Sequence, residues 1–220
     1  MAKVDEDNIL FEIEQELRNA DILSTSERNV TTETNTQTGA NTASILIPRD
    51  NVKNVRDVVI GGTTAAFGTD YTVDLDFDDS GTKRCKISFV VNQTGQIDTI
   101  LDYGTDRIFS DFPKPTLSLS SFPRIGFDLL DGTPREIELG AASNETEYLL
   151  QINVYAKTRN KLIAMKKAVK EFIMNNKKNF FYFPFITPIG YGPTIPPPFD
   201  DTKKILQRNI DCRIRFVFEN

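Results

Sequence analysis

Four aspartates stand close together in the run VDLDFDDSGT: Asp74, Asp76, Asp78 and Asp79. Carboxylates at this density could bind Ca²⁺ or provide an acid and a base for hydrolysis. The run lacks the closing Glu that an EF-hand loop carries at its twelfth position, so that motif is excluded. Apolar residues alternate with the acids, which favours a strand with a wet acidic face leading into a turn at Ser80-Gly81. We therefore predict no metal site here.

The remaining sequence offers little else for catalysis. The chain has no histidine and two cysteines, Cys85 and Cys212. Without histidine, Ser-His-Asp and Cys-His nucleophile systems are excluded, and two thiolates alone cannot complete a structural zinc site. Gly61-Gly62 lacks the spacing and the lysine of a P-loop. We predict a protein that is not an enzyme and needs no cofactor; the enzymatic alternative is a hydrolase with two carboxylates about 5–9.5 Å apart.

Composition and charge restrict the partners. The 220-residue chain is 39% hydrophobic and 26% charged, which is typical of a globular protein with a sizeable core. Its formal net charge of -5 gives no general attraction to nucleic acid. No stretch approaches the roughly 18–20 apolar residues that cross a bilayer, and the first residues are acidic, unlike a secretory signal. We expect a soluble protein made in the cytoplasm, with no membrane partner.

The first half of the chain changes character twice. Residues 5–20 place apolar residues at helical spacing with acids between them, which predicts an amphipathic helix. Residues 24–43 contain one Val and no larger apolar residue, so we expect a flexible linker or an exposed loop. From 44 to 110, short β-rich runs separated by glycines predict an all-β module.

The second half alternates strand patterns with one long helix. Strands are expected at about 117–129, 135–139, 148–157 and 209–220, with a turn at Asp131-Gly132. A helix is expected over 160–176, with an apolar stripe of Leu162, Met165, Val169, Phe172 and Ile173. Helices on one face of an antiparallel sheet make an α+β layer. We therefore predict an α+β fold, with an antiparallel sheet covered by two helices, built from 1–23 and 111–220, and an inserted all-β module over 44–110.

Two segments could form interfaces. The helical segment 157–178 carries eight basic residues and one acid. Its stripe is either a solvated face or a surface that pairs with the acidic first helix, in the same chain or in another copy. The segment 180–199 gathers aromatic residues among prolines. It is either a contact surface that is partly ordered in advance or an internally packed loop that lids the sheet.

The stretch DYGTDRIFSDFPKPTLSLSSFPRIGFDLL resembles tail-terminator, tail-completion and related neck proteins of tailed viruses. The residues that carry the resemblance are Asp102-Tyr103-Gly104, Asp111-Phe112-Pro113 and Phe122-Pro123-Arg124-Ile125. Together with the first helix, the resemblance covers about residues 5–22 and 100–220. It implies a virion structural protein of the tail or neck, made in the host cytoplasm, that forms a ring ending the tail tube and joining it to the head connector.

The resemblance also implies the partners. These are the protein itself in a ring, typically a hexamer, the tail tube protein and the head-tail connector protein. No sequence-specific nucleic-acid binding is implied, and the viral genome would pass through the lumen of the ring. A heterologous interface with the right rotation closes such a ring. We expect contacts between copies, or with the tube and the connector, from a loop at 131–147 and a loop at 180–199. The interface residues that we select are Arg135, Glu136, Glu145, Phe183, Phe185, Tyr191, Phe199, Lys166 and Lys170.

Two alternatives to the tail terminator stay open. One is another neck or connector protein of the same virion, which would bind the portal side. The other is a surface-binding or adhesin module that uses the β-rich segment 44–110. Such modules usually carry an export signal and a tryptophan platform, and this chain has no tryptophan.

Overall fold

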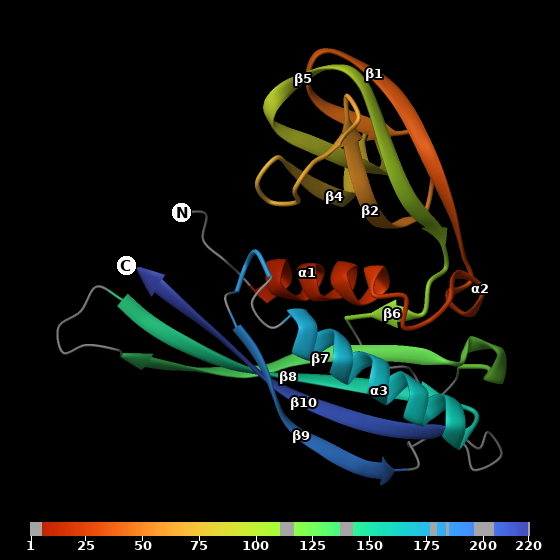
Figure 1. The fold of residues 1–220 in the computed structure, drawn as a ribbon, viewed down its shortest axis with the longest axis vertical. Coiled ribbons are helices and arrows are strands. Elements are labelled where there is room, and N and C mark those ends of the chain that lie inside the picture. The colour runs from red at the N-terminus through yellow and green to blue at the C-terminus, as the bar shows by residue number, and fades with distance from the viewer. Residues whose placement is uncertain are drawn as a thin grey trace. The chain divides into compact units, whose positions relative to one another are not determined.

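The computed structural model describes residues 6–110, 117–136, 143–176, 180–183, 185–195 and 205–219. The chain divides into two compact units (Figure 1). Unit 1 consists of Met1–Leu23 and Arg107–Asn220, and unit 2 consists of Ser24–Asp106. Each unit contains its own five-stranded sheet.

The predicted fold class, an α+β fold with one antiparallel sheet covered by two helices and an inserted module, is wrong. The protein is mainly β, with two five-stranded sheets and, in the part of the chain that the structure describes, three α-helices. The physical reason is that segments without an apolar pattern still pair as strands. The supposed linker and much of the two supposed contact loops lie in strands.

Unit 1 contains two long helices and five strands. Its elements are α1 (Glu6–Asn19), β6 (Ile108–Phe109), a 3-10 turn (Leu119–Ser121), β7 (Arg124–Glu136), β8 (Ser143–Ala156), α3 (Arg159–Asn176), β9 (Phe185–Ile195) and β10 (Leu206–Glu219). The sheet order is β6-β7-β8-β10-β9. All neighbours are antiparallel except β6 and β7, which are parallel. The two helices expected from the periodicity are confirmed.

One hydrophobic cluster joins these helices to the strands of unit 1. Its helical members are Ile9, Ile13 and Leu17 of α1 and Leu162, Met165, Val169, Phe172 and Ile173 of α3. Its strand members include Ile125, Phe127, Leu150, Ile152, Val154, Ile210, Cys212 and Ile214. The apolar stripe predicted for α3 is therefore confirmed, because all five of its residues are buried. The spacing of apolar residues identified the buried face correctly, because an amphipathic helix turns a single apolar stripe toward the core.

Prolines lie in the edge strand β9 and in the part of β7 that the two-residue strand β6 does not pair with. Pro134 lies in β7, and Pro188 and Pro193 lie in β9. Proline lacks a backbone donor, so in sheets it is restricted to edges, strand starts and bulges. The turn expected at Asp131-Gly132 is a register shift between Leu130 and Thr133 within a continuous β7. The proline-rich segment after α3 was expected to be a loop, and its described residues 185–195 form an edge strand.

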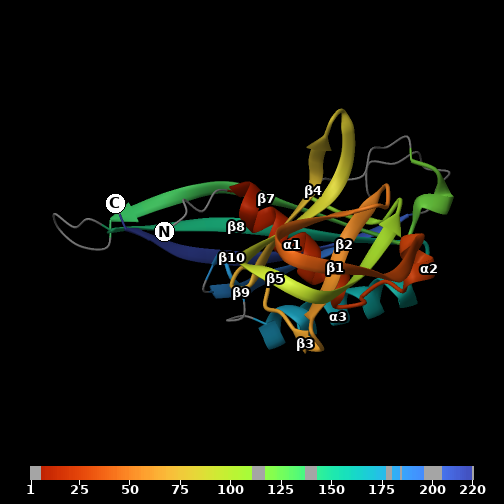
Figure 2. The same cartoon turned by 90° about the horizontal axis from the view of Figure 1, so that it is seen from above.

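Unit 2 is organised around one long strand. Its elements are α2 (Thr25–Arg28), β1 (Val30–Ile47), β2 (Val52–Ile60), β3 (Thr63–Thr64), β4 (Tyr71–Asp79) and β5 (Thr82–Gly104). β1 pairs along both halves of β5, whereas β4 pairs with its first half and β2 with its second half. In Figure 2 the hairpin of β4 and β5 stands out within this unit. Valine, isoleucine and aromatic side chains from these strands form a separate buried core.

The segment 24–43, expected to be a linker, forms α2 and most of β1. Side chains in the first half of β1 alternate between exposed and half-buried, so the sequence shows no apolar stripe. The segment is ordered because its backbone pairs with β5 from Val30↔Gly104 to Thr42↔Gln93. Its many threonines are β-branched and favour extended backbone. Each residue of this part of β1 pairs with a residue of β5 that lies more than 50 positions later in the sequence. This separation is much larger than that between the paired residues of a hairpin, so local sequence does not reveal it.

Gly104→Ala is expected to destabilise unit 2 far more than Gly62→Ala. Both glycines have positive φ, at 140° for Gly104 and 87° for Gly62, so both alanines are strained. A Cβ at position 104 would also lie 2.5 Å from the Asn29 carbonyl oxygen, whereas nothing lies within 4 Å of one at position 62. Urea denaturation should show a cost of about 1 kcal/mol for Gly62→Ala and several-fold more for Gly104→Ala. Equal costs would mean that the close approach to Asn29 is not real.

Candidate functional site

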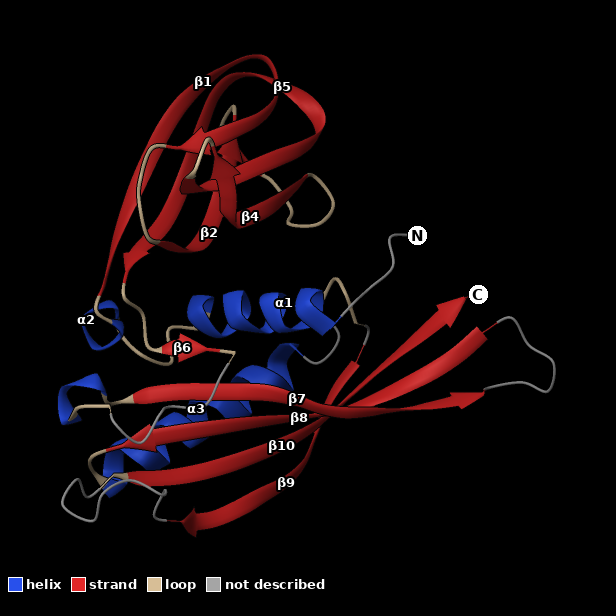
Figure 3. Cartoon of the chain, turned by 180° about the vertical axis from the view of Figure 1, so that it is seen from behind, coloured by secondary structure: helices blue, strands red, loops and turns tan. Residues whose placement is uncertain are grey.

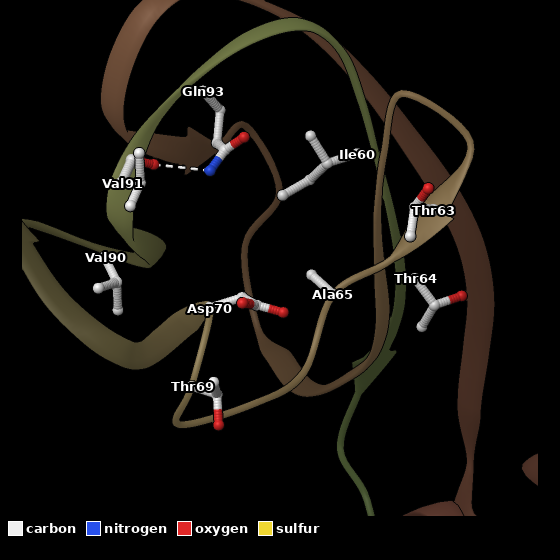
Figure 4. Close-up of a pocket in the computed structure, with 9 residues that line it drawn as sticks. All are labelled: Ile60, Thr63, Thr64, Ala65, Thr69, Asp70, Val90, Val91 and Gln93. Atoms are coloured by element: carbon white, nitrogen blue, oxygen red, sulfur yellow. Dashed lines mark hydrogen bonds between the residues drawn. The ribbon is translucent and has the colours of Figure 1, made fainter.

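A pocket of about 240 Å³ opens on unit 2 (Figure 4). Three stretches of chain line it: the β2–β3 hairpin, the loop that leads into β4, and the middle of β5. The lining residues are Ile60, Thr63, Thr64, Ala65, Thr69, Asp70, Val90, Val91 and Gln93. Val90 and Val91 are 67% and 70% exposed, the highest values among the large hydrophobic residues that the structure describes.

The loop between β3 and β4 is closed by its own hydrogen bonds. The backbone N–H of Ala66 donates to Oδ2 of Asp70 at 2.7 Å, and the N–H of Asp70 donates to the carbonyl of Ala66 at 2.8 Å. The N–H of Val90 donates to the carbonyl of Asp70 at 3.0 Å, which ties the loop to β5. The rings of Phe67 and Tyr71 meet edge to face at 5.8 Å. These contacts hold the pocket wall in place without a ligand.

The pocket is suited to binding and lacks the parts of a nucleophilic site. Its polar groups are three threonine hydroxyls, one carboxylate and one amide, and its other lining residues are Ile60, Ala65, Val90 and Val91. A threonine nucleophile needs an adjacent base, and the lining contains no histidine, lysine or cysteine. Asp70 could accept a proton or a hydrogen bond, and one of its oxygens already accepts the Ala66 N–H.

A second cleft of about 430 Å³ lies between the β1–β2 turn and the β4–β5 turn of unit 2. Its two arginines are engaged with acids of the same unit. Nε of Arg49 donates to Oε1 of Glu33 at 2.6 Å, and its guanidinium lies 4.5 Å above the Tyr103 ring. Nε of Arg84 lies 3.3 Å from Oδ2 of Asp79. The cleft therefore offers less positive charge to a ligand than its composition suggests.

The four aspartates of the VDLDFDDSGT run lie in β4, as the alternation predicted. Asp74, Asp76 and Asp78 are exposed. Oδ1 of Asp74 accepts the N–H of Asp76 at 3.0 Å, and Oδ1 of Asp78 accepts the N–H of Gly81 at 2.7 Å. These bonds shape the strand and its turn. Among the described residues, no group of three acidic, cysteine or histidine side chains could hold a metal ion.

The predicted interface residues lie in several elements of unit 1. Arg135 and Glu136 belong to β7 and Glu145 to β8, with Arg135 paired to Glu145 in the ladder. Phe185 and Tyr191 belong to β9, and the side chains of these five residues lie outside the described part. Phe199 also lies outside the described residues. The predicted loop 131–147 is strand up to 136 and from 143, and residues 137–142 are not described.

Phe183, Lys166 and Lys170 have described side chains. Phe183 is buried in the unit 1 core, where its ring stacks on Phe180 at 4.3 Å, so it cannot contact a partner from this position. Lys170 is exposed on α3 and Lys166 is half-buried. Burial, followed by the charges of Arg208 and Lys170, lowers the pKa of Lys166. Within unit 1, Lys166 therefore lies near Arg208 and Lys170.

Sequence reasoning missed a buried acid, Glu12 in α1. The residue is 4% exposed, although the sequence placed it among the acids of an amphipathic helix. Its carboxylate accepts the backbone N–H of Phe181 and, at 2.9 Å, that of Tyr182. The pKa of Glu12 is raised to about 7, because burial and the charge of Glu16 raise it by more than the two amide hydrogen bonds lower it. Glu12 therefore fixes the chain that follows α3.

A second missed cluster is a buried ionic network in unit 2. Nε of Arg28 donates to Oδ1 of Asp106 at 3.1 Å, and Nη2 donates to Oδ2 at 2.6 Å. Nη1 donates to Asp102 at 2.8 Å, and all three side chains are fully buried. Asp102 also accepts hydrogen bonds from Thr32 and Arg56. The network joins the first residues of unit 2 to its last, and no periodicity in the sequence signals it.

Comparison with known proteins adds no family. No protein-family model matches this chain, and no curated protein matches it. No helix within the described ranges is both long and apolar enough to span a bilayer. The functional argument therefore rests on the residues and on the geometry of each unit.

Proposed function

We propose that this protein is a virion structural protein that forms a ring, ends the tail tube and joins it to the head connector. The sequence resemblance of residues 5–22 and 100–220 to tail-terminator and neck proteins supports this function. Parts of that resemblance have clear structural roles. Asp102 holds the buried network of unit 2, and Phe122 packs with Tyr155 and Ile205 in a small buried cluster.

The observation that carries the proposal is an extension of the unit 1 sheet. Among the side chains that the structure describes, the core of this unit reaches Leu129 in β7, Tyr148 in β8 and Ile214 in β10. Strand pairing continues further, to Glu136↔Asn144 and to Glu219↔Ser143. From Arg215 to Glu219, β10 adds roughly 17 Å at about 3.4 Å per residue. Figure 3 shows these strand ends reaching beyond α1 and α3.

A sheet extension of this kind is suited to contact with another molecule. Strands need a packed apolar face or a covering element for stability. Glu147 pairs with both Arg213 and Arg215 at the base of the extension, but such exposed ion pairs contribute little. The β10 part of the extension is apolar in sequence at Phe216, Val217 and Phe218. A neighbouring copy that covers this extension would make a heterologous interface, which closes into a ring when its rotation allows.

Purified full-length protein is expected to form ring-sized oligomers, alone or on tail tubes. Native mass spectrometry should give the copy number, and electron microscopy with the tube protein should show tubes capped at one end. A shortened variant that replaces Thr133–Thr146 by an Asn-Gly turn should stay folded but lose assembly. A matched variant that shortens the β4–β5 hairpin of unit 2 at Ser80-Gly81 should still assemble.

The outcomes separate two parts of the proposal. A strict monomer that neither caps tubes nor binds the connector would exclude the ring function. A shortened β7–β8 variant that assembles like the wild type would be consistent with the ring function, but it would exclude the extension as the interface between copies. Circular dichroism of both variants should match the wild type within the loss of the deleted strands.

A further inference from the structure

Two hydrogen-bond acceptors point into the unit 2 pocket. Asp70 uses Oδ2 for the Ala66 N–H, which leaves Oδ1 available. Nε2 of Gln93 donates to the Val91 carbonyl at 2.6 Å, which leaves the Gln93 side-chain carbonyl available (Figure 4). The two residues come from different segments, the loop before β4 and the middle of β5. In Figure 4 the side chains of Thr64 and Thr69 point away from the space between them.

The rest of the lining is apolar and carries no positive charge. Ile60 and Ala65 point into the pocket, and the exposed Val90 and Val91 stand beside it (Figure 4). No lysine or arginine lines the pocket, so a carboxylate or phosphate would meet Asp70 without a compensating cation. The chemistry favours a neutral ligand that has several O–H donors and a hydrocarbon face.

Size and rigidity restrict the ligand further. The volume of about 240 Å³ is below the roughly 300–1,000 Å³ of pockets that take drug-sized ligands, so the pocket suits one small ring. Because hydrogen bonds already close the Ala66–Asp70 loop, little ordering is needed on binding.

We propose that this pocket binds a single neutral sugar ring, with hydroxyl groups donating to Asp70 and Gln93 and a C–H face on the valines and Ile60. The site belongs to unit 2 alone and is independent of the ring proposed for unit 1. A neutral hexose at the end of a longer glycan presents the same groups as the free sugar. This proposal therefore stands or fails separately from the assembly function.

Saturation-transfer NMR on the full-length protein tests the site with glucose, galactose, mannose, glucuronic acid and galacturonic acid. At least one neutral hexose should bind with a dissociation constant of about 1 mM, as expected for so small a ligand. The uronic acids should bind at least about tenfold more weakly, because their carboxylate faces Asp70. No signal from any neutral hexose, or equal binding of the acids, would overturn the proposal.

Three variants locate the binding. Gln93→Leu removes one acceptor and should weaken binding about tenfold. Asp70→Asn keeps an oxygen for the Ala66 N–H but places a donor in the pocket, and it should weaken binding similarly. Thr72→Val is the matched control, since Thr72 is exposed on β4 and does not line the pocket, and it should bind like the wild type. If Gln93→Leu and Asp70→Asn both bind like the wild type while remaining folded, the pocket is not the site.

Discussion

Arg28→Met is expected to destabilise unit 2 by about 3–5 kcal/mol, because it leaves two buried carboxylates without their cation. Asp102 and Asp106 are both fully buried and both bind the Arg28 guanidinium. Burial favours the neutral form of Asp102, but hydrogen bonds from Arg56 and Thr32 and the charges of Arg28 and Arg56 lower its pKa overall. Loss of Arg28 therefore removes part of what keeps Asp102 ionised. Hydrogen exchange measured along a urea titration would report the opening of unit 2 separately from that of unit 1.

Arg84→Met is the matched control for the first prediction. Arg84 belongs to the same unit and also pairs with an aspartate, but both side chains are more than a third exposed. Such pairs contribute about 0–1 kcal/mol, so this variant should open almost like the wild type. If unit 2 unfolded at the same urea concentration in both variants, the Arg28 network would not stabilise unit 2 by joining its first and last residues.

The stability of unit 1 is expected to fall by about 3 kcal/mol as the pH rises from 4.5 to 7, and Glu12→Gln should remove most of this fall. The pKa of Glu12 rises from 4.5 to about 7 on folding, chiefly through burial. Below pH 4.5 the carboxyl group is protonated in both states, so its full contribution is present. Between the two values only the unfolded chain ionises, and each unit of difference is worth about 1.4 kcal/mol. Denaturant titrations across this pH range give the slope of the free energy of unfolding against pH.

Glu171→Gln is the control for the pH prediction, since Glu171 is 60% exposed on α3. It should leave the slope unchanged. Glu16 also has a raised pKa through burial, so a smaller slope of the same sign should remain in Glu12→Gln. If the Glu12→Gln protein kept the full wild-type slope, Glu12 would not be buried against Phe181 and Tyr182 in solution.

The prediction from sequence worked best where one face of one element decides burial. The stripe Leu162, Met165, Val169, Phe172 and Ile173 on α3 was identified from spacing alone, and the alternation around Asp74 placed β4 correctly. The prediction failed where burial of side chains does not stabilise the element. β1 is held by its backbone ladder with β5, and β9 is an edge strand whose prolines suggested a loop.

The candidate sites were less accessible to sequence reasoning than the elements. Phe183 was selected as an interface residue because it lies in the aromatic segment 180–199, but it packs on Phe180 in the core. Glu12 was counted as a surface acid, although two backbone amides from a segment about 170 residues away bind its carboxylate. The pocket joins Ile60, Asp70 and Gln93, which share no motif. The burial of Phe183, the hydrogen bonds of Glu12 and the pocket all depend on contacts between segments that are distant in the sequence.

By itself, the sequence determined the two long helices, the buried stripe of α3 and the exposed acidic face of β4. These follow from local periodicity and from residue types, which need no knowledge of distant neighbours. Only the tertiary structure decided that the fold is mainly β, that the polar segment 24–43 is ordered, and that Arg28 meets Asp102 and Asp106. Strand pairing and buried ionic networks depend on long-range contacts, and local composition does not encode them.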